Sequence, residues 1–131
     1  MDEIKTLIFR TDRLGDFIIS CPFIISYKNH IKPTNISVIA SEYNFDYIKR
    51  FNFIDNVVPL KNETKFFPKL FILFKLILLL RKIKFDKIIV LDGKKRSFFI
   101  SLFLRGKKYI LLQSRDLEIF SKIFGYTYVI N

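Results

Sequence analysis

Two arginines and two aspartates fall within seven residues near the start of the chain, in the stretch RTDRLGD from Arg10 to Asp16. An apolar run that begins at Ile4 precedes this stretch, and an apolar helical pattern begins at Phe17. The order is that of a strand, a turn and a helix. In an open α/β sheet the loops at the carboxyl ends of the strands form the ligand crevice, so this turn places charge where chemistry usually occurs.

Asp16 is the candidate catalytic residue of this turn. It follows Gly15, which can adopt a backbone conformation closed to other residues, and it falls at or near a helix N-terminus. The helix dipole favours an ionised carboxylate there, so Asp16 is suited to accept a proton. Asp is also among the best N-cap residues, and the spacing leaves both roles open.

A second charged turn, DGKKRS from Asp92 to Ser97, lies between an expected strand at Lys87–Leu91 and an expected helix at Phe98–Leu104. Three cations beside the free N–H groups of a helix N-terminus make a phosphate or carboxylate site. A solvated basic loop is the other interpretation. A dinucleotide fingerprint is excluded in the first turn, because it needs three glycines and only Gly15 is present.

These stretches resemble the motifs of glycosyltransferase family 9, the family of ADP-heptose:lipopolysaccharide heptosyltransferases. The opening motif of that family is a strand, a basic residue, a short polar turn, Gly-Asp and a helix that carries a proline, which is similar to RTDRLGDFIISCPFI here. The similarity extends from about residue 4 to 108. It includes, in the family's order and approximate spacing, the stretches Ser37–Ala40, Asp55–Leu60, Phe85–Gly93 and Arg96–Ser97.

The resemblance implies a Rossmann-like acceptor-side domain, like the N-terminal half of a GT-B glycosyltransferase, with Asp16 as the general base. It implies that Arg10 and Arg13 lie near the reacting groups. It also implies that both charged turns contact the sugar acceptor, which makes substrate-binding residues of Arg10, Thr11, Asp12, Arg13, Gly15, Asp92, Gly93, Lys94, Lys95 and Arg96. No metal and no cofactor are implied.

Family members have a second domain that binds the nucleotide-sugar, and no stretch of this chain resembles it. We therefore expect residues 1–131 to form one domain, which is half of a split enzyme, a truncated relic or a free-standing acceptor-binding module. The donor-binding half would be a missing C-terminal domain or a partner chain. The implied partners are an ADP-heptose type donor and an anionic glycolipid acceptor. The alternative function is a non-catalytic α/β module that holds an anionic ligand or a partner protein in the same basic crevice.

Strand and helix patterns alternate along the chain, which favours a parallel sheet of five or six strands with helices on both faces. After the first helix we expect strands at Ile36–Ala40, Val57–Leu60, Lys87–Leu91 and Lys107–Leu112, and a sixth at Tyr126–Ile130. Between them we expect a short helix at Glu42–Arg50, capped by Ser41, and a helix at Asp116–Phe124 opened by Ser114 or Arg115.

The net charge of +11 favours anionic partners such as a phosphorylated glycolipid, an acidic membrane or a nucleic acid. Nucleic acid is disfavoured, because no helix-turn-helix, zinc-finger or RNP pattern is present. Cys21 is the single cysteine, which suits a reducing cytoplasm. The first residues are acidic, whereas a signal peptide would be basic and apolar, so a cytoplasmic protein is expected.

The stretch from Phe66 to Lys84 is strongly apolar. Its apolar run from Leu70 to Leu80 is interrupted by Lys75, and a helix of that length measures about 16 Å against about 30 Å of bilayer hydrocarbon, so it does not span. One helical face is expected to pack on the sheet, namely Phe66, Leu70, Leu73, Ile77 and Leu80. A surplus apolar stripe beside lysines remains, namely Phe67, Phe71, Phe74 and Leu78, and it suits a membrane surface, a partner domain or deeper burial.

Overall fold

The computed structural model describes residues 3–32, 34–111 and 128–130. These residues form one sheet of six parallel strands in the order β3-β2-β1-β4-β5-β6. The strands are β1 (Ile4–Arg10), β2 (Thr34–Ser41), β3 (Asn56–Leu60), β4 (Lys87–Val90), β5 (Lys107–Leu111) and β6 (Tyr128–Ile130). The helices are α1 (Leu14–His30), α2 (Phe45–Ile48), α3 (Phe66–Ile83) and α4 (Lys95–Leu102). The predicted Rossmann-like sheet is confirmed.

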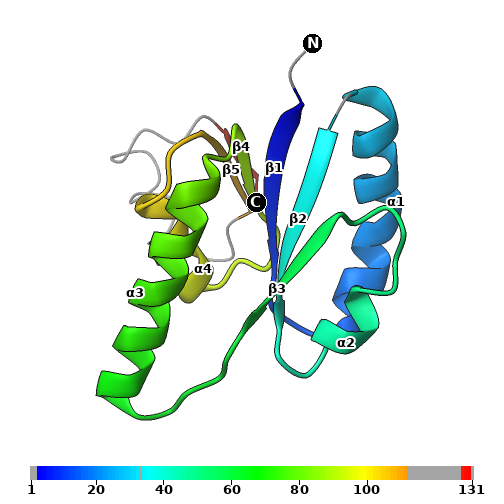
Figure 1. The fold of residues 1–131 in the computed structure, drawn as a ribbon. Coiled ribbons are helices and arrows are strands. Elements are labelled where there is room, and N and C mark those ends of the chain that lie inside the picture. The colour runs from blue at the N-terminus through cyan, green and yellow to red at the C-terminus, as the bar shows by residue number, and fades with distance from the viewer. Residues whose placement is uncertain (1–2, 33, 112–127, 131) are drawn as a thin grey trace.

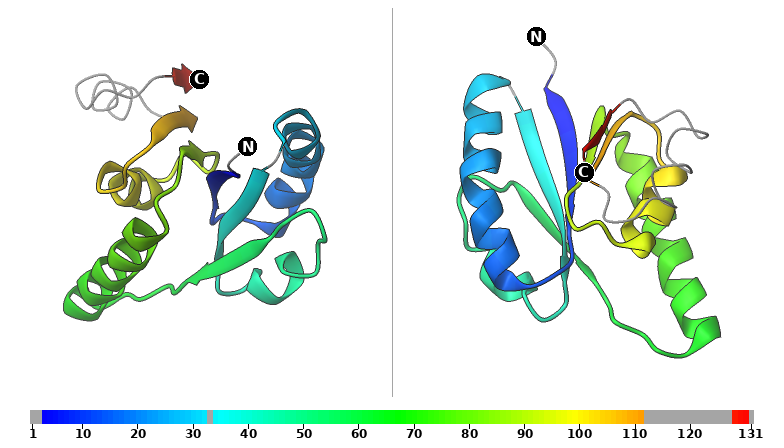
Figure 2. Two further views of the ribbon diagram at one scale, coloured as in Figure 1. Left: turned by 45° about the horizontal axis from the view of Figure 1, so that its top comes forward. Right: turned by 180° about the vertical axis from the view of Figure 1, so that it is seen from behind.

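Helices cover both faces of the sheet, with α1 and α2 on one side and α3 and α4 on the other (Figures 1 and 2). Each face has its own apolar core. Ile8, Phe17 and Ile24 belong to the core beneath α1, whereas Leu7, Phe9 and Leu80 belong to the core beneath α3. Consecutive residues of β1 are buried because a central parallel strand is covered on both sides.

The strand order reverses between β1 and β4, which is the switch point where open α/β sheets bind ligands. The two charged turns of the sequence follow these two strands, so both lie at the carboxyl edge of the sheet beside the switch point. The fold thus brings together two stretches that are about 80 residues apart in the sequence, as the contact between Thr11 and Asp92 shows.

Several predicted boundaries differ from the structure. The first helix begins at Leu14 rather than Phe17, the short helix is limited to Phe45–Ile48, and α4 begins at Lys95, before Phe98. The predicted helix at 116–124 lies outside the described residues.

The face of α3 that packs on the sheet also differs from the prediction. Leu76 and Leu80 are buried, and Leu73, Ile77 and Ile83 are partly buried against the same core. Phe66 is 67% exposed and Leu70 is 48% exposed, so their predicted burial is wrong. The first turns of α3 extend beyond the carboxyl edge of the sheet, where no strand lies beneath them (Figure 1). The surplus stripe from Phe67 to Leu78 is exposed.

Gly15 lies within α1 and does not have a positive φ, so the expectation of a special backbone conformation there is wrong. The described glycines with positive φ are Gly93, at 64°, and Gly106, at 121°. Gly106 lies where a Cβ atom would stand 2.6 Å from the carbonyl oxygen of Phe85, whereas a Cβ at Gly15 would meet open space.

Replacement of Gly106 by Ala is therefore expected to lower the free energy of unfolding by about 2 kcal/mol or more, through backbone strain and the clash. Gly15→Ala is the matched control and is expected to raise it by up to about 1 kcal/mol, because Ala is the better helix former. Urea unfolding of both variants measures the two changes. Equal stabilities would contradict the geometry at Gly106.

Candidate functional site

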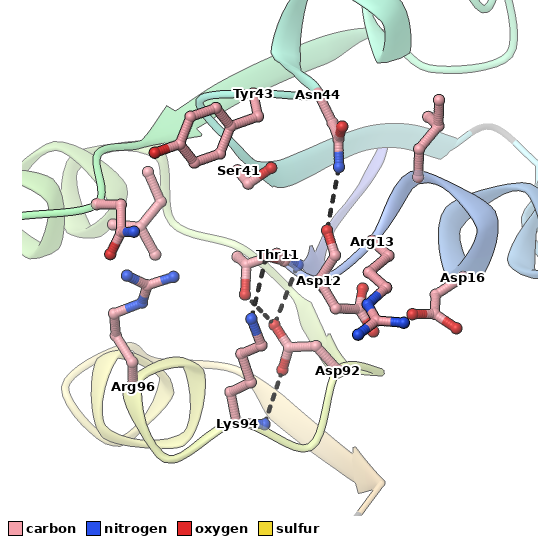
Figure 3. Close-up of a pocket in the computed structure, with 13 residues that line it drawn as sticks. Thr11, Asp12, Arg13, Asp16, Ser41, Tyr43, Asn44, Asp92, Lys94 and Arg96 are labelled. Atoms are coloured by element: carbon pink, nitrogen blue, oxygen red, sulfur yellow. Dashed lines mark hydrogen bonds between the residues drawn. The ribbon is translucent and has the colours of Figure 1, made fainter.

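A pocket of about 800 Å³ lies at the carboxyl edge of the sheet, beside the switch point (Figure 3). Seven of the predicted site residues line it, namely Thr11, Asp12, Arg13, Asp16, Asp92, Lys94 and Arg96. Arg10, Gly15, Gly93 and Lys95 are not among its lining residues. The other lining residues are Leu14, Ser41, Tyr43, Asn44, Leu60 and Asn62.

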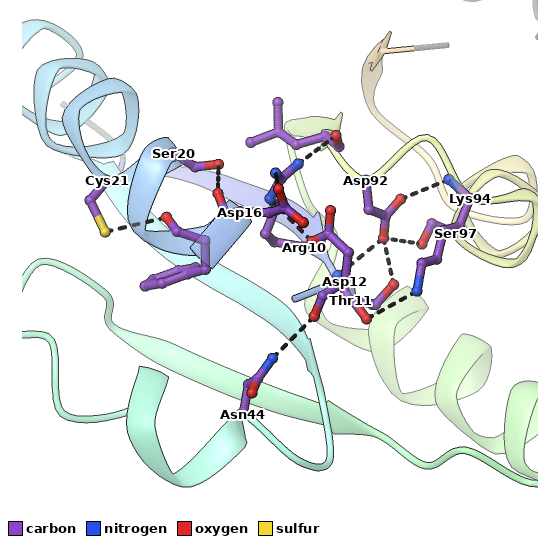
Figure 4. Close-up of polar contacts among 12 residues, drawn as sticks. Arg10, Thr11, Asp12, Asp16, Ser20, Cys21, Asn44, Asp92, Lys94 and Ser97 are labelled. Carbon is purple, nitrogen blue, oxygen red and sulfur yellow. Dashed lines mark hydrogen bonds and ion pairs between the residues drawn. The ribbon is translucent and has the colours of Figure 1, made fainter. Parts of the chain in front are cut away.

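Asp92 joins the two charged turns (Figure 4). Its Oδ2 accepts hydrogen bonds from the backbone N–H of Thr11 at 3.1 Å, from Oγ1 of Thr11 at 2.6 Å and from Oγ of Ser97 at 2.6 Å. Its Oδ1 accepts from the backbone N–H of Lys94 at 3.1 Å. Asp92 is only 2% exposed, and its carboxylate is engaged by the protein. We infer that it fixes the shape of the pocket rather than offering a free group to a ligand.

Arg10 lies behind the pocket at the end of β1. Its guanidinium donates to the carbonyl oxygen of Leu91 at 2.6 Å. It also forms ion pairs with Asp12, at 3.2 Å, and with Asp16, at 3.8 Å. Its side chain is 11% exposed. Arg10 therefore holds the two carboxylates in place and adds positive charge beside them.

Asp16 lies in the first turn of α1, where the N-cap position is taken by Arg13 and no side-chain capping bond forms. The carboxylate of Asp16 lines the pocket, and the side chain is 43% exposed. The N-cap interpretation is thus wrong. Asp16 lies at the positive end of the helix dipole, and its carboxylate is 3.8 Å from the Arg10 guanidinium. Asp16 is placed to accept a hydrogen bond, or a proton, from a ligand in the pocket.

The cations of the second turn point to different places. Arg96 reaches into the pocket opposite Asp16 (Figure 3), and its Nε is buried without a hydrogen-bond partner in the structure. Burial lowers the pKa of Arg96, against the opposing effect of Asp92. The Nζ of Lys94 lies 3.4 Å from the carbonyl oxygen of Thr11. An anionic group between Arg96 and Lys94 would receive charge-assisted hydrogen bonds.

Sequence reasoning missed the wall of the pocket formed by the ends of β2 and β3. Ser41 is the last residue of β2, Tyr43 and Asn44 follow it, and Asn62 follows β3. Asn44 donates to the backbone carbonyl of Asp12 at 3.1 Å and so ties this wall to the first turn. These residues could have been predicted from the rule that the carboxyl ends of parallel strands share one edge of the sheet, because they lie at or just after the ends of two expected strands.

Burial raises the pKa of Asp12 above its usual 3.8, although Arg10 opposes the shift. The folded protein therefore binds this proton more tightly than the unfolded chain, and the free energy of unfolding falls as pH rises through the window above 3.8. Asn cannot ionise. The stability of Asp12→Asn relative to wild type is therefore expected to rise as the pH increases above 3.8.

Urea unfolding at several pH values measures this trend, with Asp46→Asn as the control. Lys49 lowers the pKa of Asp46 through a hydrogen bond, so the stabilising effect of Asp46 is present above its unfolded pKa and lost at lower pH. As the pH rises, the free energies of unfolding of the two variants, each measured relative to wild type, should change in opposite directions. A common direction would contradict the assignment for Asp12.

No group of three side chains suited to a metal ion occurs in the described residues. Among these residues there is also no helix long and apolar enough to cross a membrane.

No protein-family profile and no curated protein sequence matches this chain. Solved structures do match. The chain is similar to a glycosyltransferase family 9 protein from Veillonella parvula, with a TM-score of 0.81 and 14% identity over 98% of this chain and 36% of that one.

Two Escherichia coli structures are also similar. Heptosyltransferase WaaC with ADP gives a TM-score of 0.76 and 16% identity over 96% of this chain and 41% of that chain. ADP-heptose LPS heptosyltransferase II gives 0.69 and 18% identity, over 82% of this chain and 30% of that chain. The present chain thus spans between 30% and 41% of the length of these proteins. Its fold is the glycosyltransferase-like α/β fold found in heptosyltransferases, which confirms the resemblance at the level of structure.

Proposed function

We propose that this chain is the acceptor-binding half of a heptosyltransferase-like glycosyltransferase. Completed by a donor-binding half, it would transfer a sugar from a nucleotide-sugar to an anionic glycolipid of the lipopolysaccharide core type. One observation carries the proposal. A half-exposed carboxylate, Asp16, lines a pocket at the switch point of the sheet, and the cations Lys94 and Arg96 line the same pocket.

In the proposed reaction Asp16 is the general base. The acceptor hydroxyl gives its proton to the Asp16 carboxylate as the hydroxyl oxygen attacks the anomeric carbon of the donor sugar. The bond from that carbon to the nucleotide diphosphate breaks, and the diphosphate leaves with the electron pair. A carboxylate within hydrogen-bond reach suits this step. Arg10 is a positioning residue, because it holds Asp16 from behind the pocket.

The acceptor is proposed to be anionic because cationic side chains line the side of the pocket opposite Asp16. Arg96 and Lys94 would bind a phosphate or carboxylate there, and Arg13 would add a third cation at the rim. Ser41, Asn44 and Asn62 offer hydroxyl and amide groups to the sugar.

The proposed donor is an ADP-heptose type nucleotide-sugar, held by a further domain or a partner chain. Two observations support it: the WaaC structure contains ADP, and the second Escherichia coli neighbour is named for ADP-heptose and lipopolysaccharide. The glycolipid would be reached from the cytoplasm, at the inner face of a membrane. The exposed apolar stripe of α3 supports this placement.

Binding of a soluble acceptor tests the proposal without the donor half. The probe is the delipidated core oligosaccharide of a heptose-deficient lipopolysaccharide, titrated by calorimetry. Arg96→Gln is expected to weaken binding about tenfold or more, because charge-assisted hydrogen bonds are lost. Arg105→Gln is the matched control, since Arg105 is exposed and is not among the residues that line this pocket. Failure of the wild-type chain to bind, or equal loss in both variants, would contradict the proposal.

A further inference from the structure

A second hollow, of about 480 Å³, lies between α3 and α4. Its walls are almost entirely apolar side chains from the two helices and from the residue that follows α4, namely Leu70, Leu73, Phe74, Ile77, Phe99, Ile100 and Phe103. Its polar lining is three cations, Lys69, Lys95 and Arg96. The two helices lie side by side in all the views (Figures 1 and 2). We call this hollow the α3–α4 groove.

The groove opens on a surface that is both apolar and basic. Phe74, Phe99 and Phe103 are each more than half exposed. Neither helix contains an Asp or Glu, whereas α3 has four cations and α4 has two. On the outer side of α3, Lys75 lies 4.6 Å from the ring centre of Phe71, so the stripe and its lysines form one surface.

This chemistry fits a lipid better than a protein partner. Protein interfaces are depleted in lysine at their cores, whereas aromatic and aliphatic faces flanked by lysines are typical of helices that lie in a membrane surface. The 18-residue α3 is about 27 Å long and would lie along the surface. The lysines complement anionic headgroups, and the groove complements an acyl chain.

The groove also adjoins the candidate acceptor pocket. Arg96 lines both hollows, and its buried Nε has no hydrogen-bond partner in the structure. An amphiphile with an anionic group at Arg96 would therefore have its polar head in the pocket and its apolar tail in the groove.

We infer that the α3–α4 groove binds an acyl chain of an anionic membrane lipid, with Lys69, Lys95 and Arg96 facing the headgroup. Acyl-chain binding follows from the groove itself. Only the link between the groove and acceptor binding rests on the proposed function.

Fluorescence offers a direct test because the chain contains no Trp. Phe74→Trp places a reporter in the groove, and Phe23→Trp places one on α1, on the other side of the sheet, where Phe23 is 45% exposed. With phosphatidylglycerol vesicles that carry brominated acyl chains, the emission of the groove reporter should shift to the blue and be quenched. The reporter on α1 should be unchanged. Phe103→Trp, also in the groove, replaces the first reporter if Phe74→Trp does not fold.

A charge-matched pair of variants tests the headgroup contacts. The double variant K69Q/K95Q is expected to bind these vesicles about tenfold more weakly or worse, because each lysine near an anionic surface strengthens binding electrostatically. K32Q/K49Q removes the same charge from residues outside the groove and should bind nearly as wild type. Binding of wild type should weaken as salt rises and should be much weaker to phosphatidylcholine vesicles.

Three results would overturn the inference. They are absence of quenching at both groove reporters, equal quenching of the α1 reporter, and a concentration-dependent dimer that shifts the emission of the groove reporter without lipid. The soluble oligosaccharide titration reports on the acceptor pocket alone. Failure of the groove to bind lipid and failure of the pocket to bind the acceptor are therefore detected by different experiments.

Discussion

Replacement of Asp16 by Asn is expected to lower the rate of sugar transfer by about two to four orders of magnitude, in an enzyme assembled from this chain and a donor-binding half. Asn keeps the size of the side chain but cannot take the proton of the acceptor hydroxyl. The loss should appear in kcat, because Asn can still hydrogen-bond the acceptor hydroxyl in the ground state.

The same substitution should leave the fold almost unchanged. Asp16 makes no capping hydrogen bond, and Arg10 retains Asp12 and the carbonyl oxygen of Leu91 as partners. A melting temperature within a few degrees of wild type is therefore expected. Asp46→Asn, on the exposed surface of α2, controls for the loss of one negative charge. Near-normal kcat in Asp16→Asn would show that Asp16 is not the base, whatever the acceptor pocket binds.

Sequence reasoning predicted the parts of this fold that depend on local periodicity and turn chemistry. The strands β1, β2 and β4 are short apolar runs bounded by polar turns, and the stretch from Arg10 to Asp16 that begins at the end of β1 carries two arginines and two aspartates at the carboxyl edge. The resemblance to glycosyltransferase family 9 implied that both charged turns lie at one crevice, which agrees with the rule that the carboxyl ends of parallel strands share an edge. Their contact through Asp92 confirms that expectation.

What the sequence could not predict depends on contacts between distant elements. Nothing local distinguishes Arg10, whose guanidinium turns inward to Leu91, from Arg96, which faces the pocket. Lys94 and Lys95 are adjacent, yet only Lys94 lines the pocket. The helix α3 is apolar on nearly every side, so its periodicity does not single out the face that Leu76 and Leu80 bury.

The chain alone is expected to transfer no sugar. The described residues form a single sheet with the acceptor pocket at its edge, and this chain spans 41% of the length of the WaaC chain solved with ADP. If the donor is held by the remaining part of such a protein, the isolated chain binds one reactant only. Holding both reactants in register supplies about 7 to 11 kcal/mol of barrier reduction, and the isolated chain forfeits most of it.

The test incubates the purified 131-residue chain with ADP-heptose and a heptose-deficient lipopolysaccharide, with a full-length two-domain heptosyltransferase as the positive control. No product above the blank without enzyme is expected, even where calorimetry shows that the chain binds the acceptor oligosaccharide. Asp16→Asn, assayed beside it, should give the same blank, because the base has no donor to act with. If the wild-type chain transferred sugar and the Asp16 variant did not, both substrates would have to bind within these 131 residues. The division into acceptor and donor halves would then be wrong, while the role of Asp16 as the base would stand.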